Sequence, residues 1–274
     1  MPWALRAAWA VVPLLLAPCL TDKLDARSAS VRTTATALLW LGWASVAIAT
    51  CIAVPACLAI VRAGTGWAVV IGAAALTPGV IVAVIAAGLA ARPETAEWFV
   101  NGPAYVNERR YPLRVPGALL FGPVWLAGAL VAVGPATGVL LLAARNYALG
   151  AIALVLGVAV AFGGGRSLYA LTRRWVVFVP AGLVLHDPMT LADPVLFERK
   201  QIESLRAAPA DTDSLDLTQA ALGLAVELVL TEKVPMVLTQ GRGAESGASA
   251  RLLFTPTRPG RVLADAATRR LPVG

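Results

Sequence analysis

Long apolar runs alternate with short basic segments over the first two thirds of the chain. Five of these runs are long enough, or nearly so, to cross a bilayer, which takes about 20 residues of helix. The first is the shortest and carries two prolines, so whether it spans fully is left open. The pattern predicts a bundle of about five transmembrane helices, near Leu5–Leu20, Thr36–Val61, Trp67–Ala91, Ala118–Ala143 and Tyr147–Gly164.

Two positions can hold the turn between the last two predicted helices. Residues 134–138 (GPATG) are typical of a turn, and Pro135 removes one helical hydrogen bond. A turn there would place Arg145 within the last span, where a charge is costly unless it is paired. We therefore prefer Arg145-Asn146 as the connection.

Beyond Arg174 the continuous apolar runs end and short apolar segments separated by turn residues begin. Residues 175–179 and 183–187, with Pro180-Ala181-Gly182 between them, predict a β-hairpin. In residues 222–230, Leu222, Leu224, Val226, Leu228 and Leu230 alternate onto one face, which predicts a strand. Further predicted elements are strands at 195–205, 234–240 and 251–256, loops at 207–221 and 241–250, and a helix within 258–271 with Val262, Leu263, Ala266 and Ala267 on its apolar side.

This order of elements predicts a small β-sandwich or partly open barrel that is capped at one end by the terminal helix. We expect a transmembrane domain at residues 1–165 and a β-domain at residues 166–274. The sequence "YALTRRWVVFVPAGLVLHD" leads from the last membrane helix into the first hairpin, and "LLFTPTRPGRVLADA" leads into the last helix.

In that order of segments, residues 166–271 resemble the bacterial pleckstrin-homology-like (PH-like) domains of membrane proteins, and the chain is similar to multi-pass membrane proteins of actinobacteria. The resemblance implies a non-enzymatic domain that binds lipid or protein at the membrane. Members of the wider fold that bind phosphoinositides use basic residues in the first hairpin turn. Here that turn, Pro180-Ala181-Gly182, carries no charge. A role in protein interaction is therefore favoured over headgroup binding by that mode.

Composition supports a membrane location. Hydrophobic residues make up 58% of the chain and charged residues only 14%, against about 25% charged in a soluble domain. The net charge of +7 is unevenly distributed, because residues 1–175 hold 13 lysines and arginines against five acidic residues, and residues 176–274 hold 10 against 11. The surplus of lysine and arginine residues flanks the apolar runs, so a nucleic-acid partner is not expected.

The same flanks predict orientation, because lysine and arginine are retained on the cytoplasmic side of a membrane. One side of the five-helix arrangement has only Arg6, Arg62 and Arg145. We therefore expect an inner-membrane (plasma-membrane) protein with an extracytoplasmic N-terminus and a cytoplasmic β-domain. The other side has ten basic residues up to the start of the first predicted hairpin, namely Lys23, Arg27, Arg32, Arg92, Arg109, Arg110, Arg114, Arg166, Arg173 and Arg174.

Residues suited to chemistry are few. The only charge within the five predicted spans is Arg6, at the end of a span, whereas ion-coupled transporters need intramembrane ionisable groups. Cys19, Cys51 and Cys57 lie in apolar runs without a CxxC spacing, and His186 is the single histidine. His186 adjoins Asp187, but neighbours on a strand point to opposite faces.

Known catalytic and phosphate-binding motifs, such as G-x-S-x-G and G-x-x-x-x-G-K-[ST], do not occur in the sequence. Asp211, Asp213 and Asp216 fall in a polar loop and are interpreted as a solvated connection. We therefore predict no catalytic residue, no metal site and no cofactor.

The segment 92–116 between the third and fourth spans is the most distinctive. Pro93, Glu94 and Glu97 suit the first turn of a short helix, and the aromatic residues that follow are typical of the headgroup region. Its arginines fit two interpretations, an ordinary positive flank or a contact with anionic lipid. Five residues are candidates for such contact: Arg109, Arg110, Arg114, Arg173 and Arg174.

These observations predict a non-catalytic accessory or scaffold subunit that presents a cytoplasmic interaction domain and associates with other membrane subunits, for example in a cell-envelope or lipid-transport complex. Two alternatives stay open. One is a sensor of anionic lipid headgroups. The other is a subunit of a membrane-embedded lipid enzyme or transporter, which requires polar residues that converge in a cavity.

Overall fold

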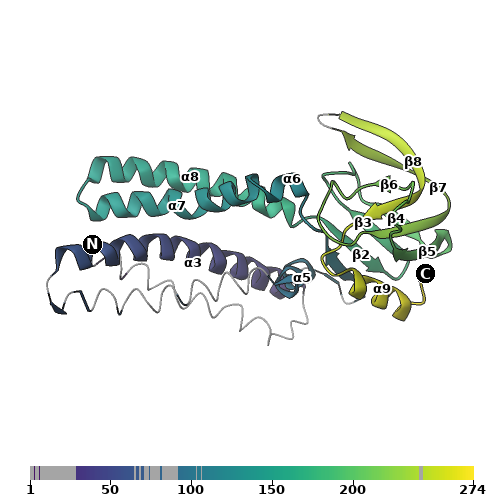
Figure 1. The fold of residues 1–274 in the computed structure, drawn as a ribbon, viewed down its shortest axis with the longest axis horizontal. Coiled ribbons are helices and arrows are strands. Elements are labelled where there is room, and N and C mark those ends of the chain that lie inside the picture. Colours follow the sequence, from purple (N-terminus) through teal and green to yellow (C-terminus); the bar gives the residue numbers. More distant parts are fainter. Residues whose placement is uncertain are drawn as a thin grey trace. The chain divides into compact units, whose positions relative to one another are not determined.

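A computed structural model describes residues 29–64, 92–102, 107–240 and 243–274, together with a few further positions. The chain divides into two compact units, and each contains two separate segments (Figure 1). The first unit is Met1–Thr95 and Pro123–Leu168, and the second is Ala96–Gly122 and Tyr169–Gly274.

The first unit contains long apolar helices. They are α3 (Ala29–Ala63), α7 (Pro123–Ala143) and α8 (Tyr147–Leu171). Much of α8 exposes large apolar side chains, which suits contact with lipid. Within the described part of the chain, three stretches have the length and hydropathy of membrane spans: Val46–Ala63, Gly117–Ala143 and Tyr147–Leu171.

These stretches confirm membrane-length apolar helices at the second, fourth and fifth of the predicted spans. The first and third predicted spans, Leu5–Leu20 and Trp67–Ala91, lie outside the described residues apart from single positions. The fold class is therefore confirmed at the level of three candidate membrane helices followed by a β-rich region.

Glycines bring α7 and α8 into close contact. A Cβ atom on Gly134 would lie 2.9 Å from the carbonyl oxygen of Gly157, and a Cβ atom on Gly138 would lie 2.6 Å from the Cβ of Leu154. Glycine is required there because the helix backbones approach each other directly. The pair of small residues at 134 and 138 therefore serves packing within this chain.

The turn between α7 and α8 lies at the preferred position. α7 continues through Pro135, and the chain reverses at Arg145, whose φ is 65°. The amide of Asn146 donates to the carbonyl of Leu141 over 3.0 Å, which satisfies an acceptor at the helix end. The structure thus confirms Arg145-Asn146 as the connection and excludes a turn at residues 134–138.

The second unit begins with two short helices and an antiparallel sheet. The helices are α5 (Pro93–Asn101), which starts just before the unit boundary as predicted from Pro93 and Glu94, and α6 (Gly117–Leu120). The sheet has the order β1-β2-β3-β4, and the β2–β3 hairpin confirms the prediction for residues 175–187. Its strands are β1 (Arg109–Pro112), β2 (Trp175–Val179), β3 (Gly182–His186) and β4 (Val195–Glu198).

β1 is the unexpected member of this sheet. It comes from the segment between two membrane helices, and it pairs along β2 with Arg110 opposite Val177 and Tyr111 opposite Val176. A segment that was predicted only as a membrane flank is therefore an edge strand. This pairing is why residues 96–122 belong to the second unit, whereas the sequence analysis placed them in a transmembrane domain at 1–165.

The second sheet has the order β5-β7-β8-β6. β6 runs parallel to β8, whereas the other neighbours are antiparallel. The helix α9 (Pro259–Thr268) follows and confirms the predicted terminal helix. The strands are β5 (Ile202–Ala207), β6 (Leu215–Asp216), β7 (Val226–Gln240) and β8 (Gly243–Phe254).

Residues 195–205 were predicted as one strand, and this was wrong. β4 ends at Glu198, a 3-10 turn covers Arg199–Gln201, and β5 starts at Ile202 in the other sheet. The amide of Glu198 donates to the side chain of Gln201 over 2.9 Å as one half of a capping box, which stabilises the turn. The chain passes from one sheet to the other at this point.

The long alternating segment 222–230 was only partly predicted correctly. β7 begins at Val226, and Leu222 and Leu224 lie outside it with 53% and 71% of their surface exposed. Gly223 has a φ of +125°, which breaks the extended backbone between the two leucines. β7 then continues to Gln240 through an irregularity between Val229 and Val234, so 222–230 and 234–240 do not form separate strands.

The glycine-rich segment 241–250 was predicted as a loop, but residues 243–250 form the first part of β8. Ser249 pairs with Val234 and Gly243 pairs with Gln240. Glycine, alanine and serine have little preference for strands, so the pairing with β7 imposes the extended form.

A single apolar core joins the two sheets and α9. Val262 and Ala266 of α9 are fully buried in it, as predicted, whereas Ala267 on the same helix is exposed. Among the described strands the two sheets stay separate and do not close into a barrel. The largest apolar side chains that are fully buried in this core are Phe178, Leu183, Leu185, Leu191, Phe197, Leu205, Leu228, Leu252 and Phe254.

Glu227 is a buried carboxylate within β7. It accepts hydrogen bonds from Thr212 and Ser214 at 2.6 Å each and from Arg206 at 2.7 Å. Burial alone would raise the pKa of the Glu227 carboxyl, but the hydrogen bonds from Ser214, Thr212 and Arg206 together outweigh burial and lower the pKa to about 2. Glu227 thereby fixes the polar segment 207–221 to the second sheet.

Candidate functional site

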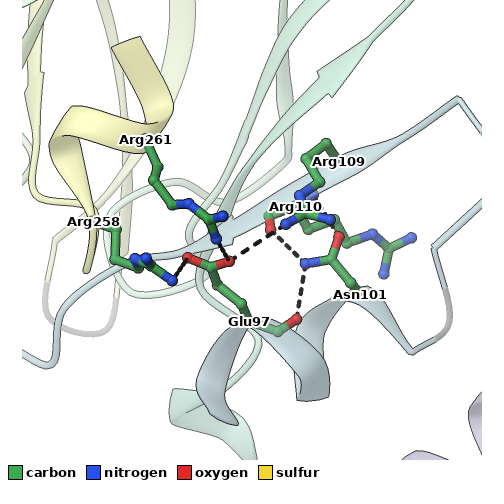
Figure 2. A network of polar contacts seen from close by, with 6 residues as sticks. All are labelled: Glu97, Asn101, Arg109, Arg110, Arg258 and Arg261. Atoms are coloured by element: carbon green, nitrogen blue, oxygen red, sulfur yellow. Dashed lines mark hydrogen bonds and ion pairs between the residues drawn. The ribbon is translucent and has the colours of Figure 1, made fainter. Parts of the chain in front are cut away.

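The most concentrated set of charges in the described residues of the second unit surrounds Glu97, on the last turns of α5. The Glu97 side chain is only 4% exposed, yet it contacts three arginines (Figure 2). Its Oε2 lies 3.5 Å from Arg109 and 3.2 Å from Arg261, and its Oε1 lies 3.4 Å from Arg258. The arginines come from β1 and from the start of α9. We call these four residues the Glu97 cluster.

The Glu97 cluster joins elements far apart in the sequence. A buried carboxylate is costly unless it is paired, so Glu97 stabilises an arrangement in which β1 and α9 both reach α5. Asn101, one turn beyond Glu97, ties α5 to β1 by backbone contacts (Figure 2). Its Nδ2 donates to the carbonyls of Glu97 and Arg110 over 2.8 Å each, and its Oδ1 accepts from the Arg110 amide over 2.9 Å.

A groove of ≈ 390 Å³ opens between β1 and α9 beside this cluster. Arg109 and Arg261 face both Glu97 and the groove, and their side chains are 42% and 53% exposed. On the α9 side, Asp265 accepts from Arg269 over 3.2 Å, so this carboxylate is already paired. We call this the arginine groove, and its lining residues are Arg109, Tyr111, Arg261, Ala264, Asp265, Thr268 and Arg269.

Tyr111 forms the floor of the arginine groove. Burial raises the pKa of Tyr111, and Asp265 adds to the increase, whereas a hydrogen bond and the charge of Arg109 oppose it. The phenol therefore stays protonated at neutral pH and keeps a hydroxyl that can donate. Its ring packs edge-on against Phe178 with centroids 5.9 Å apart, which anchors β1 to the core.

The five arginines predicted from the sequence to contact lipid do not form one surface. Arg109 lies in the arginine groove, and Arg173 is exposed after α8. Arg110 pairs with Glu108 over 3.0 Å and lies 5.4 Å from the centre of the Trp175 ring. Arg114 is half-buried, and its Nε has no hydrogen-bond partner among the described residues.

Arg174 is placed differently from the prediction. Its side chain is 2% exposed, and its Nε and one terminal nitrogen each donate to Asp187 over 2.7 Å. Its other terminal nitrogen donates to the carbonyl of Arg114 over 2.8 Å. Arg174 therefore cannot reach a lipid headgroup without breaking a buried ion pair.

The histidine next to this pair takes no part in it. His186 packs against Trp175 with ring centroids 4.8 Å apart, while Asp187 is committed to Arg174. Burial lowers the pKa of His186, the charge of Arg173 lowers it further, and Asp187 opposes both effects. His186 is thus mainly neutral at physiological pH and serves packing at the end of the hairpin.

The arginines on α9 and the role of Glu97 were not predicted from the sequence. A signal was available, because Arg258, Arg261, Asp265 and Arg269 recur at spacings of three and four, which places them on one side of a helix. Their common partner on α5 could not be found in this way. Arg261 and Glu97 are 164 residues apart in the chain.

Metal ligation has no support within the described part of the chain, where no group of three or more His, Cys, Asp or Glu side chains comes together. Cys51 and Cys57 are free thiols on α3, whereas Cys19 lies outside the described residues. The acidic residues of the polar loop, Asp211, Asp213 and Asp216, are exposed.

No protein-family model, curated protein or solved structure matches this chain.

Proposed function

We propose that this chain is a non-catalytic accessory or scaffold subunit of the inner membrane, with five spans and a cytoplasmic PH-like domain that binds other subunits of a cell-envelope or lipid-transport complex. The observation that carries the proposal is that two separate segments of the chain make up the second unit. It is built from residues 96–122 and 169–274, and the two membrane helices α7 and α8 lie between these segments in the sequence.

This connectivity supports a scaffold more than a flexible appendage. The chain passes between the two units three times, at residues 95–96, 122–123 and 168–169. A domain on one linker is joined to its membrane anchor at a single point of the chain, whereas this unit is joined at three. Such a connection suits a domain that works together with its membrane helices.

The architecture of the second unit supports the PH-like part of the proposal. Two four-stranded sheets and a C-terminal helix share one core. Apart from β1, the strands come first and the helix last, which is the order that the resemblance implies. The cytoplasmic placement rests on the excess of basic residues on that side of the five-helix arrangement. A periplasm-active reporter enzyme fused after Gly274 should be silent, and reporter activity would overturn the orientation.

Affinity purification in mild detergent tests the scaffold function. The wild-type chain should retain partner subunits in fixed ratios. An Asp187→Lys variant places an unpaired charge in the core of the second unit. It should lose the partner subunits that bind the β-domain. Substitution of Arg251, an exposed residue of β8, by glutamine is the matched control. A wild-type chain that elutes alone, or with the same proteins as Asp187→Lys, would contradict the scaffold function.

A second candidate function, a sensor of anionic lipid headgroups, is favoured by the arginine groove. Of the five arginines predicted from sequence, Arg173 is exposed and Arg109 is half-buried with its side chain 42% exposed, and the groove adds Arg261 and Arg269 to Arg109. Binding of the full chain to anionic lipid should fall when Arg109 and Arg173 are both changed to glutamine. Unchanged binding would exclude these residues as the sensor.

A further inference from the structure

Two leucines in the loop between β6 and β7 are more exposed than any other large aliphatic side chain in the described part of the second unit. Leu222 and Leu224 each expose more than half of their surface. The residues around them, 217–226, include no charged side chain. Isolated exposed leucines are common in soluble proteins, whereas two close together in an uncharged segment are typical of a binding surface.

The conformation of this loop is fixed by its backbone and its contacts. Gln219 and Ala220 have φ values of 53° and 54°, a region that residues other than glycine rarely adopt. Two such residues in succession persist only where the surrounding structure determines them. The Gln219 side chain donates from its Nε2 to the carbonyl of Met189 over 2.9 Å, which ties the loop to the chain that follows β3. The loop therefore holds its two leucines outward.

The loop contacts the start of a candidate membrane span. Gly117 is the first residue of the span Gly117–Ala143, and a Cβ atom on it would lie 2.6 Å from the carbonyl oxygen of Ala220. A Cβ atom on Gly223 would lie 2.8 Å from the Nε of Arg114. All four residues belong to the second unit. Because an arginine that precedes a span lies among the lipid headgroups, these contacts place the loop at headgroup level.

The end of a second candidate span lies beside the same residues. The span Tyr147–Leu171 ends three residues before Arg174. The Arg174 carbonyl accepts from the amide of Leu113 over 3.0 Å, and a terminal nitrogen of its side chain donates to the carbonyl of Arg114 over 2.8 Å. Two spans therefore enter the second unit at neighbouring points. The loop with the two leucines lies on that side of the unit, where the bilayer is expected.

We propose that residues 219–224 dip into the bilayer and place Leu222 and Leu224 at the boundary between headgroups and hydrocarbon. The loop lies where a span begins, it has no charge to desolvate, and transfer of its leucines from water to hydrocarbon is favourable. Phe121, four residues after Gly117, is likewise exposed, which suits the same apolar surroundings. The inference goes beyond the proposed function and needs only the membrane helices, so it holds whether or not the chain binds other subunits.

Fluorescence of a labelled loop residue in the full chain tests the proposal. Leu224→Cys is labelled with the environment-sensitive fluorophore nitrobenzoxadiazole in nanodiscs of phosphatidylcholine. Glu232→Cys, an exposed position further along β7, is the matched control. Both variants are made in a background in which alanine replaces the natural cysteines, Cys19, Cys51 and Cys57.

The label at residue 224 should emit at shorter wavelength than the label at residue 232 and should resist quenching by iodide in the water. It should also be quenched by phosphatidylcholine that carries a spin label on the upper part of an acyl chain. Equal quenching at the two positions would overturn the proposal. Protection from iodide without quenching by the spin-labelled lipid would also overturn it, because that result means that protein, such as a second copy of this chain, covers the loop.

Photo-crosslinking of the unsubstituted chain gives a second measurement. Phosphatidylcholine with a diazirine on the upper acyl chain should form adducts within residues 219–224 and not within residues 229–233. Changing both leucines to glutamine should reduce the adduct yield about tenfold or more, since a single leucine side chain already changes transfer into hydrocarbon about tenfold. Leu196→Gln, the same change at another exposed leucine, should leave the yield unchanged. A loop without adducts, or equal yields in the two variants, would contradict the inference.

Discussion

Acidification should weaken the second unit through Glu227, and the size of the effect follows from its hydrogen bonds. The Glu227 carboxyl has an ordinary pKa of 4.5 and a pKa of about 2 in the folded chain. A carboxyl with a lowered folded pKa contributes stability that is full above the unfolded pKa and is lost as the pH falls toward the folded pKa. At about 1.4 kcal/mol per pKa unit, the contribution at neutral pH is about 3 kcal/mol.

Only part of this contribution is lost in an accessible pH range. Between pH 6 and pH 3 the unfolded carboxyl becomes almost fully protonated while the folded one stays mostly ionised. The linkage relation then gives a loss of about 2 kcal/mol in the free energy of unfolding. Glu227→Gln keeps the shape and an acceptor oxygen for Thr212 and Ser214 but cannot titrate. It also loses the charge-assisted bond from Arg206, so at pH 6 it should be less stable than the wild type by about 2 kcal/mol.

Urea unfolding of the full chain in nanodiscs, followed by tryptophan emission, measures both effects. The wild type should lose about 2 kcal/mol more than Glu227→Gln between pH 6 and pH 3. Glu232→Gln, an exposed glutamate in the same strand, is the matched control and should follow the wild type. If the wild type and Glu227→Gln lose equal stability over this range, the assignment of the acid sensitivity to Glu227 is refuted.

Three further substitutions, one of them with a matched control, test the packing. Asp187→Asn leaves Arg174 buried without its counter-charge and should reduce the free energy of unfolding by about 3 to 5 kcal/mol in the same urea assay, whereas a loss below about 1 kcal/mol would contradict the buried pair. Gly157→Val should force α7 and α8 apart and lower the thermal stability of the detergent-solubilised chain. Gly163→Val, where an added Cβ would meet nothing within 4 Å, should leave this stability unchanged. Gly182→Ala should destabilise the first sheet, because φ there is +156° and the new Cβ would collide with a carbonyl oxygen of β4, and an unchanged urea midpoint would argue against that contact.

The elements that the sequence predicted well are those whose signal is local. The runs that became α7 and α8 are apolar over their whole length, and the β2–β3 hairpin has its turn residues between two apolar segments. The helix α9 shows a helical spacing of apolar residues and Pro259 in its first turn. Neighbouring residues in the sequence determine these elements, so they can be predicted without knowledge of the fold.

The missed features depend on distant partners. Arg109–Pro112 carries two arginines and a proline, and it becomes a strand only because β2, far along the chain, pairs with it. Residues 243–250 lack β-branched side chains, and pairing with β7 holds them extended. Leu222 and Leu224 fit an alternating pattern, but the backbone at Gly223 leaves the extended region before the sheet begins.

The position of β1 in the sequence, ahead of α7 and α8, also determines the order of events during synthesis. β1 leaves the ribosome before α7 and α8, and its partner β2 leaves after them. Since translation adds about 5 to 20 residues per second, β1 waits several seconds before the first sheet can form. Completion of that sheet follows insertion of the helical hairpin, so a chain with a misinserted hairpin would expose an unpaired strand that quality-control proteases can recognise.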